Sequence, residues 1–267
     1  MTQQFPNEDF QITNAAPELE VRGLSLWYGD KQALKDVSFD LHSNELLAFI
    51  GPSGCGKSTA LKCLNRMHDH TRDVRIEGDI LFRQRDAYAP EVDPPEYRRH
   101  FGWVAQKPNP FPASIYRNVA YGAQIHGLTR TKAELDAHVE SCLRRAHLWD
   151  EVKDGLNKLQ GTDLSGGQQQ RLCVARALST QPDILLMDEP TGSIDPIATA
   201  KVEELMMSLK QDHAVVVITH SMMEARRLAD RVAYFHLGEL LEIGPTEQMF
   251  TAAQSPEAKA FIAGKFG

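Results

Sequence analysis

The chain has 267 residues, of which 42% are hydrophobic and 24% are charged, and its formal net charge at pH 7 is -7. These values are typical of a globular protein long enough for one large domain or two small ones. The negative charge and the lack of a long basic run argue against nucleic acid as the main partner, because a phosphate backbone attracts a basic face.

The N-terminal residues 1–18 are polar, and we expect them to form a flexible segment. The first twenty residues contain no Lys or Arg and no apolar stretch, which argues against a secretory signal. No part of the chain approaches the roughly 18 apolar residues of a membrane-spanning helix. The four cysteines form no C-x-x-C pair, as is usual in a reducing cytosol. We therefore expect a cytoplasmic protein, which can still dock on a membrane protein.

Alternating polar and apolar residues predict strands at 19–26 and 37–41, and the β character returns at 74–82. We expect these segments to form an antiparallel β layer. Residues 90–95 are rich in proline and are predicted to form a loop, and a short strand is predicted at 101–104.

Residues Gly51 to Ser58 read G-x-x-x-x-G-K-S and lie between an apolar run at 46–50 and a predicted helix at 59–64. In this setting the backbone N–H groups of the loop and of the helix N-terminus cradle phosphate groups. Lys57 is expected to act on the β- and γ-phosphates and Ser58 on Mg²⁺. The alternative is a plain glycine-rich turn, but the strand–loop–helix context favours a nucleotide site. The expected nucleotide-binding residues of this loop are Gly51, Pro52, Ser53, Gly54, Cys55, Gly56, Lys57, Ser58 and Thr59.

Residues 107–112 cannot form regular structure, because their prolines lack N–H donors and restrict their neighbours. Three helices are predicted after them, at 114–127, 131–147 and 148–159. We expect this block, about residues 108–163, to be a helical insertion in an otherwise α/β chain.

The α/β pattern then resumes towards the C-terminus. Its predicted elements are strands at 184–187, 215–218 and 231–235, helices at 197–210 and 221–229, and a helix after Gly244. The continuous apolar strands indicate a parallel sheet that is covered on both faces.

Two carboxylates, Asp188 and Glu189, directly follow the apolar run at 184–187. In a protein with a P-loop, a carboxylate at such a strand end can bind Mg²⁺, and the adjacent Glu189 can act as general base on the attacking water. An acidic pair after a strand otherwise usually just begins a loop. The P-loop favours the functional interpretation.

A second phosphate-binding pattern precedes a predicted helix that ends at Leu178. It consists of Leu164, Ser165, Gly166, Gly167 and Gln168. Ser165 is locally an N-cap, but a hydroxyl, glycine N–H groups and a helix N-terminus also form an anion site. One nucleotide does not need two such sites in one chain. We therefore interpret the two as halves of a composite site that is completed across a dimer.

Together, these motifs make the sequence resemble the ATP-binding subunits of ABC transporters over about residues 19–267. The resemblance implies a P-loop NTPase fold, with a RecA-like α/β core, an antiparallel β subdomain and an inserted α-helical subdomain. It implies that Tyr28 stacks on adenine and that Gln106 contacts Mg²⁺ and senses the membrane partner. It also assigns Asp195 to the D-loop and His220 to the position near the γ-phosphate.

The resemblance further implies an ATPase that uses Mg²⁺ and lies peripherally on the cytoplasmic face of a membrane. Two copies would meet head to tail and dock on two transmembrane permease subunits. Runs such as KPNPFP at 107–112 and LWDEVKD at 148–154 are similar to the ATP-binding subunits of phosphate importers. That narrower resemblance adds a periplasmic or extracellular phosphate-binding protein as an indirect partner and a phosphate-regulon regulator as a further partner. The chain departs from the family at Gly192 of the D-loop, at Ala105, and at residues 83–85, which replace a glycine turn.

Two alternatives stay open. The same ATPase can serve a phosphonate or amino-acid importer. It can also be a soluble ABC ATPase that acts on DNA or ribosomes, or a nucleotide sensor. This second class predicts coiled-coil insertions, tandem cassettes or basic arms, and the sequence contains none of them.

Overall fold

The computed structural model describes residues 16–265, so most of the predicted flexible segment 1–18 lies outside the described residues. The strands are β1 (Leu19–Tyr28), β2 (Lys31–Leu41), β3 (Leu46–Ile50), β4 (Val74–Phe82), β5 (Arg85–Asp86), β6 (Phe101–Val104), β7 (Ile184–Asp188), β8 (Ala214–Ile218), β9 (Arg231–His236) and β10 (Glu239–Pro245). The α-helices are α1 (Lys57–Leu64), α2 (Pro94–Arg99), α3 (Ile115–Ile125), α4 (Lys132–Arg145), α5 (Trp149–Val152), α6 (Gly166–Leu178), α7 (Pro196–Leu209), α8 (Met222–Leu228), α9 (Thr246–Ala252) and α10 (Pro256–Ile262).

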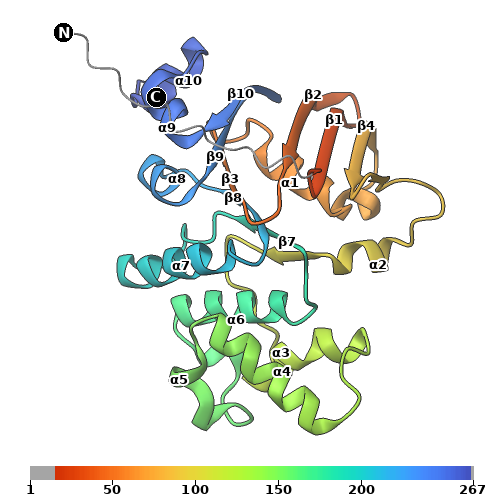
Figure 1. Cartoon of the computed structure of the whole chain (residues 1–267), viewed down its shortest axis with the longest axis vertical. Coiled ribbons are helices and arrows are strands. Elements are labelled where there is room, and N and C mark those ends of the chain that lie inside the picture. The colour runs from red at the N-terminus through yellow and green to blue at the C-terminus, as the bar shows by residue number, and fades with distance from the viewer. Residues whose placement is uncertain (1–15, 266–267) are drawn as a thin grey trace.

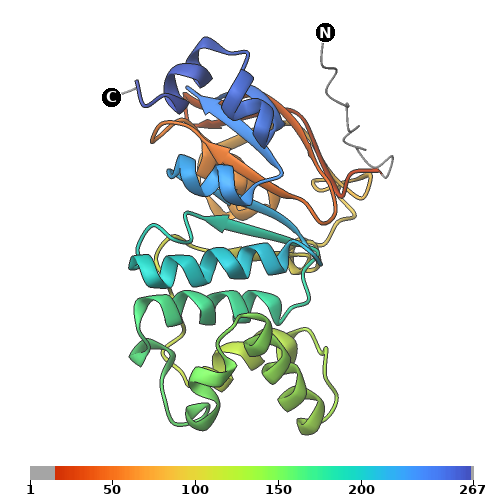
Figure 2. The same ribbon diagram turned by 60° about the vertical axis from the view of Figure 1, so that its left-hand side comes forward.

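The strands form two sheets. An antiparallel sheet has the order β2-β1-β4-β5, and a six-stranded sheet has the order β10-β9-β3-β8-β7-β6. The second sheet is parallel from β9 to β6, and β10 pairs antiparallel with β9. The predicted class, α/β with an antiparallel and a parallel sheet, is confirmed. Figures 1 and 2 show both sheets at one end of the molecule and α3 to α6 at the other.

The parallel sheet is buried on both faces. Leu47 and Phe49 of β3 belong to a core shared with the antiparallel sheet and α1. Leu46, Ala48 and Ile50 belong to the core on the opposite face, to which helices α3 to α10 contribute. Because side chains alternate along a strand, an apolar run such as β3 supplies both cores at once. Strands β3, β8 and β7 are parallel neighbours, so their carboxyl ends meet at one edge of the sheet. Ligands bind at this edge in folds of this kind.

The predicted helix at 148–159 is wrong in its second half. Helix α5 ends at Val152, a 3₁₀ turn follows over Lys153–Gly155, and the chain then folds back. The carbonyl groups of Leu156 and Leu159 accept hydrogen bonds of 2.9 and 3.2 Å from N–H groups at the start of α3. A Cβ on Gly155 would lie 2.6 Å from Cδ1 of Leu159, so a larger residue here would displace the Leu159 side chain.

The predicted loop at 90–95 and the single C-terminal helix are also corrected. Helix α2 begins inside the first segment, because its two prolines occupy the first helical turn, where no N–H donor is needed. The C-terminal region forms α9 and α10. Ser255 caps α10 by accepting a 3.2 Å hydrogen bond from the N–H of Ala258, and Pro256 starts a new helix.

The turn between β4 and β5 forms without glycine. Arg83 and Gln84 have φ values of 50° and 64°, the left-handed pair that a two-residue hairpin needs. The Arg83 guanidinium forms ion pairs of 2.6 Å with both Glu18 and Asp183, which hold the turn in place. Within residues 16–265, no helix combines the length and the apolar character that crossing a membrane requires.

Candidate functional site

The loop after β3 curls around its own lysine. Gly51, Gly54 and Gly56 have φ values of 142°, 75° and 110°, which side-chain-bearing residues rarely adopt. A Cβ on Gly51 would lie 2.1 Å from the carbonyl oxygen of Phe235. The Lys57 ammonium donates to the carbonyl oxygens of Gly51 at 2.7 Å and Pro52 at 2.9 Å, and the residue is 5% exposed. The loop is therefore preformed around a positive charge.

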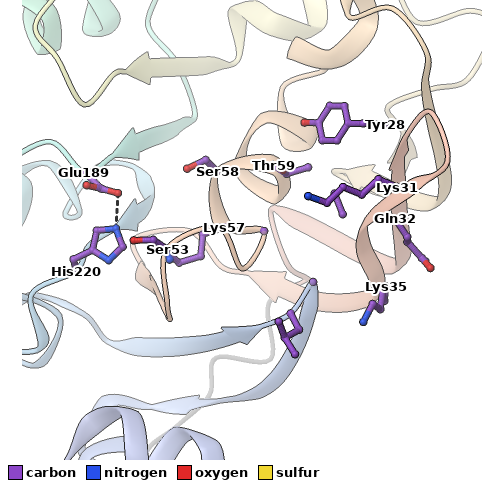
Figure 3. Close-up of a pocket in the computed structure, with 15 residues that line it drawn as sticks. Tyr28, Lys31, Gln32, Lys35, Ser53, Lys57, Ser58, Thr59, Glu189 and His220 are labelled. Atoms are coloured by element: carbon purple, nitrogen blue, oxygen red, sulfur yellow. Dashed lines mark ion pairs between the residues drawn. The ribbon is translucent and has the colours of Figure 1, made fainter. Parts of the chain in front are cut away.

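A pocket of about 640 Å³ opens over this loop (Figure 3). The predicted residues that line it are Tyr28, Ser53, Gly54, Gly56, Lys57, Ser58, Thr59, Glu189 and His220. Tyr28 is 37% exposed, and its ring lies edge-on to His68 with 5.7 Å between the ring centroids. An exposed aromatic face at the end of a phosphate-binding pocket can stack on a nucleotide base.

Residues that the sequence reasoning missed line the same pocket. Lys31, Gln32 and Lys35 extend from β2, and Leu237 and Gly238 form the β9–β10 turn on the other side. Of the two lysines, Lys35 is paired with Glu239 at 3.1 Å, whereas Lys31 adds positive charge near the phosphate-binding loop, which favours an anionic ligand. Their only signal in the sequence is their position directly after Tyr28.

Ser58 and Asp188 contact each other beside the phosphate-binding loop. The Ser58 hydroxyl donates a 3.0 Å hydrogen bond to Oδ1 of Asp188. Burial raises the pKa of Asp188, the Ser58 hydrogen bond opposes this, and the charge of Glu189 adds to it. A half-buried carboxylate beside a second one is stabilised by a divalent cation. Within the described residues, no three His, Cys, Asp or Glu side chains form a metal cluster, so a cation here would also need ligand phosphate oxygens, as Mg²⁺ prefers.

Glu189 is held from two other loops. Its Oε1 forms a 2.7 Å ion-pair contact with Nε2 of His220, and its Oε2 accepts a 2.8 Å hydrogen bond from the Gln106 side-chain amide. Figure 3 shows Glu189 and His220 facing each other at one end of the pocket. Glu189 has a φ of 48°, and its N–H donates to the Ile218 carbonyl oxygen at 3.0 Å. A strained backbone conformation held by neighbouring loops indicates a functional position.

Residues 164–168 do not join this pocket. Ser165 is the N-cap of α6, where its hydroxyl accepts from the Gln168 N–H at 3.4 Å and its N–H donates to the Gln168 side chain at 3.0 Å. None of these five described residues lines the P-loop pocket. Figures 1 and 2 both show α6 beyond α7, away from α1. At Gly167 a Cβ would lie 2.3 Å from Cβ of Ala198, so α6 and α7 pack closely there.

The loop between β7 and α7 carries the predicted D-loop residue. Asp195 caps α7 and accepts hydrogen bonds of 3.0 Å from the N–H groups of Ile197 and Ala198. The N–H of Gly192 donates to the Glu189 carbonyl oxygen at 3.0 Å. A Cβ on Gly192 would meet that oxygen at 3.4 Å, an ordinary contact, so the space around this atypical glycine also admits a side chain.

Glu151 of α5 joins three helices through its carboxylate. It accepts two hydrogen bonds from Arg171, at 2.9 and 3.0 Å, and one each from Gln168 of α6 and Lys201 of α7, at 3.0 Å. The Arg171 hydrogen bonds contribute most to lowering the pKa of Glu151 to about 2, while burial opposes them. In the sequence Glu151 belongs only to the run at 148–154, and no local pattern there predicts this role.

Replacement of Glu151 by glutamine is expected to lower the free energy of unfolding at pH 7 by about 1–2 kcal/mol, since buried Arg171 loses its partner and part of the effect is screened by solvent. Because folding lowers the pKa of Glu151, its stabilising effect is present above its ordinary pKa and is lost as pH falls towards about 2. Urea unfolding at pH 7 and pH 3.5 should show the difference between wild type and variant shrinking. Asp150→Asn is the control, since that exposed partner of Lys153 should contribute little. A pH-independent difference would contradict this assignment.

Comparisons with known proteins agree with this geometry. The family described as "ABC transporter" matches residues 34–192. A curated relative, the phosphate import ATP-binding protein PstB of Salinibacter ruber, is 51% identical over 251 residues, which are 94% of this chain and 99% of that protein. Among solved structures, cbiO1 from Clostridium perfringens, part of the ABC transporter complex cbiONQ, has a TM-score of 0.76 at 26% identity, covering 88% of this chain and 91% of its own. An ATP-bound bacterial Atm1-family ABC exporter has a TM-score of 0.77 at 26% identity, covering 99% of this chain and 44% of its own.

Proposed function

This chain belongs to the family of ABC transporter ATP-binding domains, and we propose that it hydrolyses ATP to drive the uptake of inorganic phosphate across the cytoplasmic membrane. One observation carries the ATPase part of the proposal. The P-loop, Tyr28, Glu189 and His220 line one pocket although they come from four separate parts of the chain. The choice of phosphate rests on the 51% identity to a phosphate import ATP-binding protein along nearly the whole chain.

The chain's own residues supply the binding and the proton chemistry. The backbone N–H groups of residues 53–59 and the Lys57 ammonium bind the β- and γ-phosphates of ATP, and Tyr28 stacks on the adenine. Lys57 gives up its bonds to loop carbonyls and holds the charge that develops on the phosphates. Glu189 orients the attacking water and accepts its proton, and His220 fixes the Glu189 carboxylate beside the γ-phosphate.

Three side chains beside the phosphate-binding loop fit Mg²⁺ as the metal cofactor. Ser58, Asp188 and Gln106 offer hydroxyl, carboxylate and amide oxygens, the hard donors that this ion takes. When bound, Mg²⁺ neutralises phosphate charge and lowers the barrier to phosphoryl transfer. The Gln106 side-chain nitrogen donates to Glu189 at 2.8 Å, and its amide oxygen would be the group that holds the metal, so this one side chain connects the metal site with the base.

The second half of the ATP site is proposed to come from another copy of the chain. Residues 164–168 lie outside the P-loop pocket of their own chain, yet they form a helix N-terminus with glycine N–H groups that suits an anion. In a head-to-tail dimer, each of these segments covers the partner's nucleotide, and the D-loop around Asp195 lies between the two sites. ATP favours the closed dimer because it contacts both halves only there, and hydrolysis reopens it.

The transporter context completes the proposal. The chain acts as a peripheral subunit on the cytoplasmic face of the membrane, where a dimer of it docks on two transmembrane permease subunits. The loop at 106–112 passes the motion on to them. An extracellular or periplasmic phosphate-binding protein is an indirect partner, and a phosphate-regulon regulator is a further partner. A phosphonate or amino-acid importer is the second candidate, and the identity to the phosphate import relative favours phosphate.

Phosphate uptake in the source host tests this proposal. Deletion of the gene should abolish uptake, wild type should restore it, and Lys57→Ala should not, because that variant lacks the phosphate-binding charge. Uptake that stays normal in the deletion strain, with no other phosphate system present, would redirect the search to the other solutes. Rescue by Lys57→Ala would instead contradict a role for ATP.

A further inference from the structure

Glu224 is a buried carboxylate that lies behind the pair Glu189–His220. It is 3% exposed, and the Thr191 hydroxyl approaches its two carboxylate oxygens at 3.1 and 3.2 Å. The Thr219 hydroxyl also donates to it. Thr191 stands two residues after Glu189, and Thr219 directly precedes His220. One carboxylate therefore joins the two loops that carry these side chains.

The position of Glu224 in its helix makes these contacts informative. It is the third residue of α8, after the N-cap Ser221, where a glutamate usually turns back to the N–H of the cap residue. Here Thr219 takes over that task, since its hydroxyl accepts the Ser221 N–H at 3.0 Å. The Glu224 carboxylate is thus free of helix capping and binds the Thr191 loop instead.

The surroundings of Glu224 argue against a role in filling space. A cavity of about 380 Å³ lies against it, lined also by Glu189, His220 and Glu203. Burial raises the pKa of Glu224, and the two threonine hydrogen bonds oppose this. An apolar side chain would avoid the desolvation cost of a buried carboxylate. Unlike an apolar side chain, the carboxylate forms hydrogen bonds to both loops, and this is the reason to place a carboxylate here.

We propose that Glu224 is a positioning residue for ATP hydrolysis. By accepting hydrogen bonds from Thr191 and Thr219, it holds the two loops together and so keeps Glu189 and His220 in place relative to each other. This inference rests on the roles proposed above for Glu189 and His220. Glu224 acts through the strained backbone of Glu189, whose φ of 48° persists only if the surrounding loops hold it. Glu224 does not line the nucleotide pocket, so it should affect turnover and not ATP affinity.

Steady-state ATP hydrolysis by the full-length chain tests the inference. Glu224→Ala is expected to lower kcat by about tenfold and to change KM for ATP by less than about threefold. Glu224→Gln keeps one acceptor oxygen and should recover part of the loss. Thr191→Val should lower kcat as well, and the double variant with Glu224→Ala should be no slower than Glu224→Ala alone, because both changes break the same connection.

Glu203→Gln is the matched control. Glu203 lines the same cavity and pairs with Arg227 of α8, but within residues 16–265 its carboxylate hydrogen-bonds neither loop. This variant should keep the wild-type kcat, and thermal unfolding of every variant checks the fold. An unchanged kcat in folded Glu224→Ala, or an equal loss in Glu203→Gln, would overturn the inference. Glu189→Gln is measured in parallel: if it stays active, the proposed base is wrong, whereas an inactive Glu189→Gln beside an active Glu224→Ala rejects only the role of Glu224.

Discussion

Replacement of Glu189 by glutamine is expected to lower ATP turnover by about 10²- to 10³-fold and to leave ATP binding intact. The amide has nearly the shape of the carboxylate but cannot accept the proton of the attacking water. Its oxygen can still accept from Gln106 or His220, which contact Glu189 at 2.8 and 2.7 Å in the wild type. The two halves of the site should therefore close on ATP and fail to reopen.

Two measurements check this expectation. Single-turnover hydrolysis reports the chemical step, and size-exclusion chromatography with ATP should show a stable dimer of Glu189→Gln but not of wild type. Glu204→Gln makes the same chemical change on an exposed residue of α7 and should leave both readouts unchanged. A monomeric, fully active Glu189→Gln would show that another group takes the proton.

Replacement of Lys57 by methionine is expected to weaken ATP binding by at least about 100-fold, which corresponds to about 2.7 kcal/mol. The ammonium is the only charge that the loop wraps with its own carbonyl groups, at 2.7 and 2.9 Å among the described contacts. Methionine fills the same buried space without offering a donor to the phosphates. The fold should survive, because Leu61 and Leu64 still pack α1 into the core.

Titration with a fluorescent ATP analogue measures this loss. Lys62→Met, on the same helix but not among the lining residues of the pocket, serves as control and should bind like wild type. Lys57→Arg should retain part of the affinity, because the charge remains while the shape no longer fits the loop. If Lys57→Met bound the analogue within about twofold of wild type, the phosphates would have to lie elsewhere in the pocket.

The sequence predicted the features whose signal is local. The P-loop, the LSGGQ segment and the apolar strands are contiguous runs, and each constrains its own backbone through glycine, helix capping or burial. This sufficed for the fold class and for the residues that face the pocket from the P-loop. The incorrect second half of the helix at 148–159 shows the limit, because there the carbonyl groups of Leu156 and Leu159 bind the start of α3.

The tertiary structure alone decided which distant side chains meet. Gln106 and Glu189 are 83 positions apart in the chain, and Thr191 and Glu224 are 33 apart. No periodicity or turn preference relates such pairs, because they meet only when parallel strands place their carboxyl ends at one edge. The sequence by itself therefore predicted a nucleotide site at the P-loop. The packing of the sheet decided that Glu189 faces His220, that Glu224 accepts hydrogen bonds from both of their loops, and that residues 164–168 lie apart from the pocket.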